Sequence, residues 1–316
     1  MVGLALVAVG LGVFAWSSGE PAPGLPLATD PPPARPGGPV VIMAAGDIAC
    51  DPRDTRFRSG AGTAQGCHMR ATAELLTAQE PDAVLALGDL QYGTGGMADY
   101  QASFGPTWGR ARAITRPVPG DDDYENADGS GYFGYFGAAA GQPKTGWYSF
   151  DLGSWHLIAL NSNCHRVGGC EAGSPQERWL QADLAAHRNR CTLAFWHHPR
   201  FASSEAGVDG SLLAFWRDLH AAGAELVVNG QNHFYERFAP QDPAGRRDRS
   251  RGIRQFIVGT GGQQHHPISL AAPNSEVRNH TTFGVLQLTL GRGGYAWEFV
   301  PEAGGAFSDS GRGTCH

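Results

Sequence analysis

Lysine is nearly absent from this 316-residue chain: Lys144 is the single lysine among 24 basic residues. There is also no long block of basic residues, and the formal net charge is -6. Proteins that hold nucleic acid through its phosphates need clustered Lys and Arg. Sequence-specific nucleic-acid binding is therefore excluded as the main function. The preference for arginine is typical of base-composition bias and carries no functional conclusion.

Two chemical motifs are missing as well. No GxSxG sequence occurs, which excludes the usual serine hydrolase. None of the six cysteines forms a CxxC pair, so zinc ribbons and dithiol redox sites are disfavoured. An even number of cysteines in an exported chain favours disulfides, with a free buried cysteine as the alternative at each position. Short loops predict the first two bonds and elimination the third: Cys50–Cys67, Cys164–Cys170 and Cys191–Cys315.

The N-terminal region has the composition of an export segment. Residues 3–16 are almost wholly apolar, and a Pro-rich tract follows over residues 20–39. No Lys or Arg precedes the apolar run, and its length is short for a membrane-spanning helix. We predict a signal peptide or N-terminal membrane anchor over residues 1–19, a linker over 20–39 and one domain over 40–316; the alternative for the apolar run is a buried core helix. The expected location is secreted or extracytoplasmic, with residues 3–16 as a membrane tether.

From residue 40 onward, short apolar runs end in Gly or in a polar residue. They cover residues 41–47, 83–89, 117–121, 192–198, 225–233 and 255–262. Continuous apolar runs of this length are typical of strands buried on both faces. Helices are predicted at 174–188 and 210–222, and antiparallel hairpins at 146–161 and 283–301. We predict an α/β fold in which two packed sheets are covered by helices.

The polar residues at these strand ends carry side chains that commonly bind metal ions. Ligands gather at the carboxyl ends of strands in α/β sheets. Carboxylates that converge there would repel one another unless cations lay between them, which favours a two-metal hydrolytic centre. A carboxylate that caps the following helix is the alternative for any single position. The candidates are Asp47, Asp89, Tyr92, Asp121, His197, His198 and His233.

The ordered set of motifs resembles the calcineurin-like metallophosphoesterases, in particular their purple acid phosphatase-like branch. The resemblance covers roughly residues 40–300. It depends on GD at 46–47, GDLQY at 88–92, a GNH-like element at 120–124, HHP at 197–199 and a GHxH-like element at 230–233. The resemblance implies a four-layer α/β/β/α sandwich and a binuclear metal centre at the strand ends.

One metal site is complete by this resemblance. Its implied ligands are Asp47, the bridging Asp89, Tyr92 and His233. A tyrosine three residues after the bridging aspartate marks the purple acid branch, where a phenolate binds ferric iron. The alternative for Tyr92 is an aromatic side chain that packs beside the site.

The second metal site departs from the family pattern. Its implied ligands are Asp89, Asp121 in place of Asn, His197, and Gln231 in place of the first His of GHxH. Asp122 occupies the position of the catalytic His and is, with His198, a catalytic candidate. A solvated acidic loop is the alternative for Asp122 and Asp123. Carboxylate and amide oxygens make this site harder, which favours Mg, Ca or Mn over Zn or Fe.

The expected function is an exported phosphoesterase in which a metal-bound hydroxide attacks phosphorus directly. Its cofactors would be two divalent or mixed-valence ions drawn from Fe, Mn, Zn, Mg or Ca, and its substrate a phosphorylated small molecule or nucleotide. Loss of the catalytic His predicts weakened activity. The alternative is a catalytically silent descendant that binds one metal and an extracellular ligand.

Three other features are expected to be secondary. Arg200 follows HHP and is positioned either for a substrate phosphate or for a salt bridge. His265 and His266 lie together on a loop, where surface placement is the usual outcome. The aromatic run at 132–137 is expected to pack a loop.

Overall fold

The computed structural model describes residues 1, 3, 38–126, 128–188, 191–204, 208–268 and 270–316. The predicted linker and most of the predicted export segment therefore lie outside the described residues. Among the described residues, no helix combines the length and apolar character needed to cross a membrane.

Two β-sheets form the centre of the molecule. The first has the order β13 (Ser310–Thr314), β12 (Gly294–Pro301), β11 (Gly284–Gly291), β1 (Val40–Ala45), β2 (Ala83–Leu87) and β3 (Thr115–Val118). The second has the order β10 (Ser275–Asn279), β8 (Tyr235–Phe238), β9 (Arg254–Val258), β7 (Leu226–Asn229), β6 (Cys191–Trp196), β5 (Trp155–Ala159) and β4 (Tyr148–Leu152). Both predicted hairpins are present as the antiparallel pairs β4–β5 and β11–β12.

The parallel strands carry the predicted chemistry. β1, β2 and β3 run parallel, and so do β5, β6, β7 and β9. The carboxyl ends of parallel strands meet at one edge of a sheet. The polar residues that follow these strands are therefore brought to a common edge.

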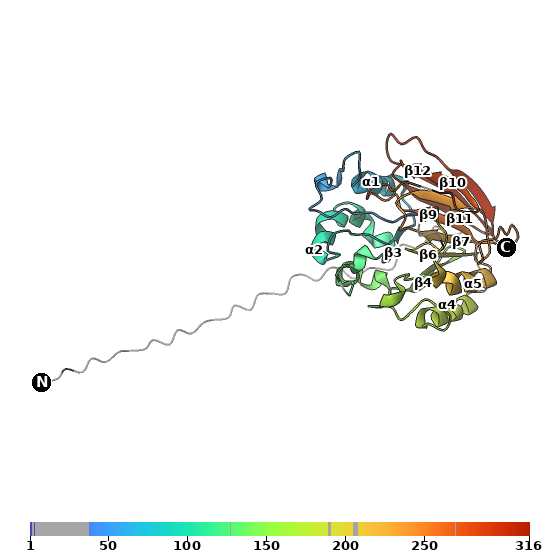
Figure 1. The fold of residues 1–316 in the computed structure, drawn as a ribbon, viewed down its shortest axis with the longest axis horizontal. Coiled ribbons are helices and arrows are strands. Elements are labelled where there is room, and N and C mark those ends of the chain that lie inside the picture. Colours follow the sequence, from blue (N-terminus) through green and yellow to red (C-terminus); the bar gives the residue numbers. More distant parts are fainter. Residues whose placement is uncertain (2, 4–37, 127, 189–190, 205–207, 269) are drawn as a thin grey trace.

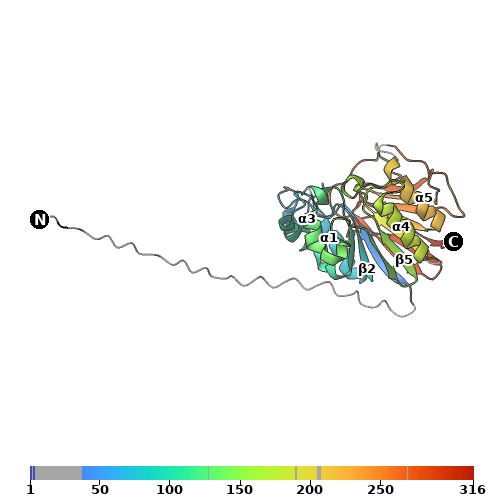
Figure 2. The same ribbon diagram turned by 90° about the horizontal axis from the view of Figure 1, so that it is seen from below.

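Helices cover the outer faces of the two sheets. Figures 1 and 2 both place α1 with the shorter helices on one flank and α4 with α5 on the other. The helices are α1 (Met69–Gln79), α2 (Met97–Asp99), α3 (Ser130–Phe136), α4 (Pro175–Ala186) and α5 (Leu213–Ala222). Short helical turns occupy residues 58–60, 100–104, 108–114, 122–124, 137–140, 164–166 and 210–212. This is the predicted sandwich of two sheets between helical layers.

The apolar core follows the alternation of each strand. In β5, Leu157 packs between the sheets while Ile158 packs beneath the helices; in β6, Phe195 and Trp196 divide in the same way. Successive side chains of a strand point to opposite faces, so a strand buried on both faces needs a continuous apolar run. This explains the apolar runs in the sequence.

The two longer predicted helices form with small differences. Ser174 caps α4, its hydroxyl accepting a hydrogen bond from the backbone of Glu177 at 3.2 Å, and Pro175 is the first helical residue. The second predicted helix divides into a turn at 210–212 and α5. Its Leu213 is only half-buried, whereas Phe215 is fully buried.

Three disulfide bonds close the covalent framework. They join the pairs that loop length and elimination predict, Cys50–Cys67, Cys164–Cys170 and Cys191–Cys315. The last bond spans 124 residues and fastens the C-terminal tail to the start of β6.

Candidate metal centre

Strained turns present the acidic residues at the sheet edge. Asp47 and Asp89 follow β1 and β2, and Gln231 follows β7. All three have left-handed backbone conformations, with φ of 59°, 48° and 70°. Such conformations are costly for residues other than glycine and gather at functional sites. The turns after β1 and β2 bring the carboxylates of Asp47 and Asp89 together beside His197.

Tyr92 lies at the centre of the first group of predicted ligands. Its hydroxyl oxygen is 3.2 Å from Asp47 Oδ1, 3.1 Å from Asp89 Oδ2 and 2.9 Å from His233 Nε2. His233 Nε2 is in turn 3.2 Å from Asp47 Oδ1. The single phenolic proton can serve only one of these acceptors.

A cation fits this first group. Neighbouring ligand atoms around an ion with bonds of about 2.1 Å lie about 3.0–3.4 Å apart, which the Tyr92 distances match closely. The second carboxylate oxygen of Asp47 is buried without a hydrogen-bond partner. Burial, with the charges of Asp89 and Asp47, raises the pKa of Tyr92 well above its ordinary value. Its phenolate therefore requires a neighbouring cation.

His197 is held with one nitrogen turned to the second group. Its Nδ1–H donates to the carbonyl oxygen of Leu87 at 2.8 Å, which leaves Nε2 facing the carboxylates. Nε2 is 3.3 Å from Asp89 Oδ2 and 3.4 Å from Asp121 Oδ1, and it is buried without a hydrogen-bond partner. A backbone carbonyl on the far nitrogen is the usual support for a metal-binding histidine. Asp89 thus stands between the two groups, as a bridging ligand would.

Glycine is required where His197 packs. A Cβ atom on Gly88, whose φ is +86°, would lie 2.4 Å from His197 Nδ1. A Cβ on Gly120 would lie 2.0 Å from Asp89 Oδ1. In these two GD motifs the aspartate is the candidate ligand, and the glycine leaves the space that a neighbouring ligand side chain occupies.

The remaining second-site candidates lie around His197. Gln231 Oε1 is buried and without a hydrogen-bond partner. The exposed carboxylate of Asp121 lies beside two imidazole rings. Its Oδ1 is 3.4 Å from His197 Nε2 and 3.2 Å from His198 Nε2. Desolvation of its carboxylate opposes ionisation of Asp121, but the neighbouring imidazoles of His197 and His198 lower its pKa. The structure therefore brings all of the metal candidates to one edge.

Asp122 and Asp123 have different surroundings. Burial raises the pKa of Asp122 to about 8, and the charges of Asp89 and Asp121 add to the rise. Asp123 is fully buried and accepts hydrogen bonds from the Leu90 backbone and the Tyr100 hydroxyl. The solvated-loop alternative is wrong for Asp123, because this carboxylate ties the acidic loop to the loop after β2.

The secondary residues take structural places. The Arg200 guanidinium donates hydrogen bonds to the carbonyl oxygens of Asp209 and Pro243. His265 is half-buried and stacks on Phe283, with ring centres 3.9 Å apart. The exposed His266 stacks on His233 at the same separation. The aromatic run at 132–137 forms α3, with Tyr132 and Phe136 buried in the core.

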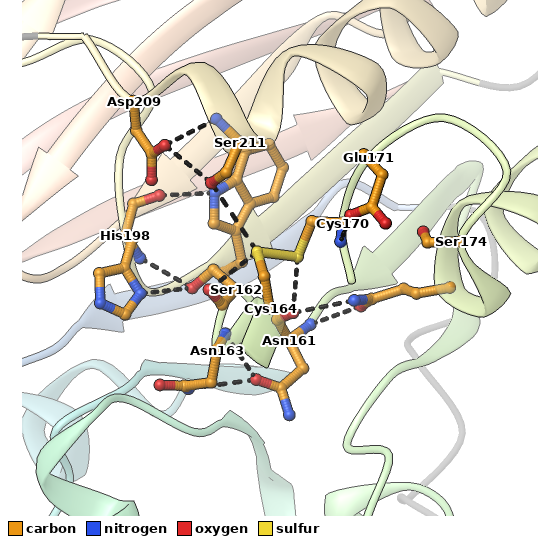
Figure 3. The surroundings of a disulfide bond; sticks show 12 residues. Asn161, Ser162, Asn163, Cys164, Cys170, Glu171, Ser174, His198, Asp209 and Ser211 are labelled. Carbon is orange, nitrogen blue, oxygen red and sulfur yellow. Dashed lines mark hydrogen bonds between the residues drawn. A yellow bond between two sulfur atoms is a disulfide. The ribbon is translucent and has the colours of Figure 1, made fainter. Parts of the chain in front are cut away.

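Sequence reasoning missed the polar turn 161–163 that follows β5. Asn161, Ser162 and Asn163 are buried, and the Ser162 hydroxyl contacts His198 (Figure 3). The apolar run of residues 157–160 ends in this turn. The pattern that identified the other strand ends therefore applies here too, although amides and hydroxyls are weaker markers than carboxylates.

Comparison with known proteins agrees with this architecture, although no family model matches the chain. In sequence, it is 28% identical over 203 residues to purple acid phosphatase 15 of Arabidopsis thaliana, covering 52% of this chain and 37% of that protein. In structure, it matches purple acid phosphatase PPD1 of yellow lupin with a TM-score of 0.70 and 16% identity, covering 89% of this chain and 55% of the other. A dimetal phosphatase from Danio rerio matches with a TM-score of 0.56 and 13% identity, over 86% and 98% of the two chains.

The fold is therefore that of the metallophosphoesterases. The resemblance to calcineurin-like enzymes and purple acid phosphatases, first seen in the motifs, is confirmed in sequence and in structure. The matched region spans about two fifths of the length of the curated relatives.

Proposed function

We propose that this chain is an exported phosphoesterase that works with two metal ions. Four donor atoms, from Asp47, Asp89, Tyr92 and His233, carry the proposal, because each lies 2.9–3.2 Å from at least one other. Asp89 would join this site to a second one. There, His197, Asp121 and Gln231 are the proposed ligands. Three disulfides support an extracytoplasmic location.

Two cations at these positions would offset the carboxylate charges, polarise the phosphoryl oxygens and activate water at neutral pH. The residues of the chain do the rest. His198 stands beside Asp121 with 27% of its side chain exposed, so it is accessible to a substrate. Asp122 occupies the position of the family's catalytic histidine, and its raised pKa is compatible with a protonated carboxyl group. The substrate class that fits is a phosphate ester of a small molecule or nucleotide.

The acidic loop favours a second candidate. Asp121 and Asp122 add negative charge beside Asp89, and this charge opposes a phosphate dianion. A descendant that holds one metal and binds an extracellular ligand without hydrolysis would tolerate such a loop. The two functions differ in metal stoichiometry and in turnover.

The proposal is tested by metal analysis and hydrolysis of an aryl phosphate. Asp89→Ala is expected to lower occupancy of both sites and abolish turnover, because Asp89 faces both groups. Asp128→Asn, a change on an exposed loop, serves as the control and is expected to retain both properties. Full metal content and turnover in Asp89→Ala would overturn the proposal.

A restoring variant separates the two candidates. Asp121→Asn, Asp122→His and Gln231→His together return the family pattern. If the enzyme is merely weakened, metal occupancy and rate rise together, the rate by about 100-fold or more where the general acid is limiting. Asp122→His alone should change the rate more than the occupancy. A triple variant that holds two metals without turnover would favour the silent descendant.

A further inference from the structure

Two adjacent histidines at the centre are held by different partners. The Nδ1–H of His197 donates to a carbonyl oxygen, so Nε2 is the ring nitrogen that faces the carboxylates. His198 is held instead by a hydroxyl group, that of Ser162, as Figure 3 shows. A carbonyl only accepts hydrogen bonds, whereas a hydroxyl both donates and accepts.

The contacts of Ser162 determine which ring nitrogen of the neutral His198 carries the proton. Ser162 Oγ accepts the backbone N–H of His198 at 3.0 Å and lies 2.8 Å from His198 Nδ1. Among the hydrogen bonds of the described residues, Nδ1 is the acceptor that Ser162 has for its hydroxyl proton. The hydroxyl therefore donates to Nδ1, and the neutral imidazole carries its proton on Nε2. That N–H points to Asp121 Oδ1, 3.2 Å away.

Ser162 is well placed for this task. It is 6% exposed and lies three residues after the end of the buried strand β5. Neighbouring Asn163 donates to the carbonyl oxygens of Pro119 and Gly120, at 3.2 and 3.3 Å, and so holds the loop that carries Asp121. The same turn thus fixes both members of the His198–Asp121 pair.

The far end of the turn is also fastened. The Cys164–Cys170 disulfide begins one residue after Asn163. The carbonyl oxygen of His198 accepts a hydrogen bond from the Trp196 indole at 2.7 Å. The His198 backbone and ring are therefore both restrained, and a change at Ser162 alters the ring without removing the other supports.

We propose that Ser162 is a positioning residue that keeps His198 in the Nε2–H tautomer. His197 then offers a lone pair to a metal, while His198 offers an N–H donor to Asp121 or to a phosphate oxygen. The inference about catalysis depends on the proposed phosphoesterase function, but the tautomer itself does not.

The tautomer is measured directly by long-range ¹H–¹⁵N NMR of ¹⁵N-histidine-labelled protein at alkaline pH. His198→Gln identifies the His198 signals by their loss. The expected wild-type pattern has an unprotonated Nδ1 and a protonated Nε2 on His198. A protonated Nδ1 in the wild type would overturn the proposal without the need for any variant.

Variants at position 162 supply the second test. Ser162→Ala is expected to mix the tautomers of His198 and lower kcat by about tenfold or more with unchanged metal content. Ser162→Thr keeps the hydroxyl and should restore both. Ser211→Ala, which removes a hydroxyl on the other side of the Cys164–Cys170 disulfide, is the control and should match the wild type.

The two proposals fail in different ways. If Ser162→Ala leaves the Nε2–H tautomer unchanged, the positioning role is wrong, whatever the enzyme does. If the wild type shows the expected tautomer but turns over no phosphate ester, the positioning role stands and the proposed function fails.

Discussion

Replacement of Gly88 by alanine tests how the fold holds His197. The new Cβ would lie 2.4 Å from His197 Nδ1 and 2.6 Å from its Cβ, and the ring is fully buried. The left-handed backbone at this position costs alanine about 1–2 kcal/mol. Displacement of a packed side chain adds about 1–3 kcal/mol. We expect Gly88→Ala to lower the free energy of unfolding by about 2–5 kcal/mol and to reduce metal binding at the second site.

Gly304 provides a matched control. Its φ is +88°, nearly that of Gly88, but a Cβ there would meet no atom within 4 Å. Gly304→Ala should therefore show only the backbone cost of about 1–2 kcal/mol and normal metal content. Urea denaturation of metal-free protein and elemental analysis of the purified variants give the two readouts. Equal destabilisation of the two variants, with equal metal content, would refute the packing role of Gly88.

Two further predictions concern stability. Removal of the Cys191–Cys315 bond by Cys191→Ala and Cys315→Ala should lower the free energy of unfolding by up to about 5 kcal/mol, because the bond closes a loop of more than a hundred residues. Calorimetry of the double variant checks this, and an unchanged melting temperature would contradict it. The hydrogen bond that the protonated His68 ring donates to the Glu302 carboxylate raises the pKa of His68. The pair therefore stabilises the fold below the unfolded pKa of about 6.5 and loses this contribution as pH rises through the folded pKa. The stability difference between the wild type and His68→Gln should therefore shrink with rising pH in urea titrations, and a difference that is independent of pH would count against the ion pair.

The sequence allowed the fold class, and the grouping of most of the candidate ligands, to be predicted for one physical reason. Strands buried on both faces must be continuously apolar, so Asp47 and Asp89 stand out at their ends. The parallel order of the strands then brings these residues together. The same logic placed Tyr92 and His233, whose side chains meet at 2.9 Å.

Other parts depend on contacts between distant segments and could not be predicted in this way. Asp123 looks like its acidic neighbours in the sequence, yet it is buried, and its carboxylate accepts hydrogen bonds from the backbone N–H groups of Leu90 and Gln91 in another loop. The Arg200 guanidinium donates to the carbonyl oxygens of Asp209 and Pro243, the second of which lies in a segment distant in the sequence. The tautomer of His198 depends on Ser162, 36 residues earlier in the chain.

The central claim is that one carboxylate, Asp89, joins two metal sites in a phosphoesterase. The most direct measurement is metal content per chain, taken together with aryl phosphate hydrolysis, on the purified wild type and on Asp89→Ala. The account predicts two ions with turnover in the wild type, and loss of metal from both sites with loss of turnover in the variant. A wild type that holds one ion and hydrolyses nothing, or a variant that keeps both ions, would contradict it.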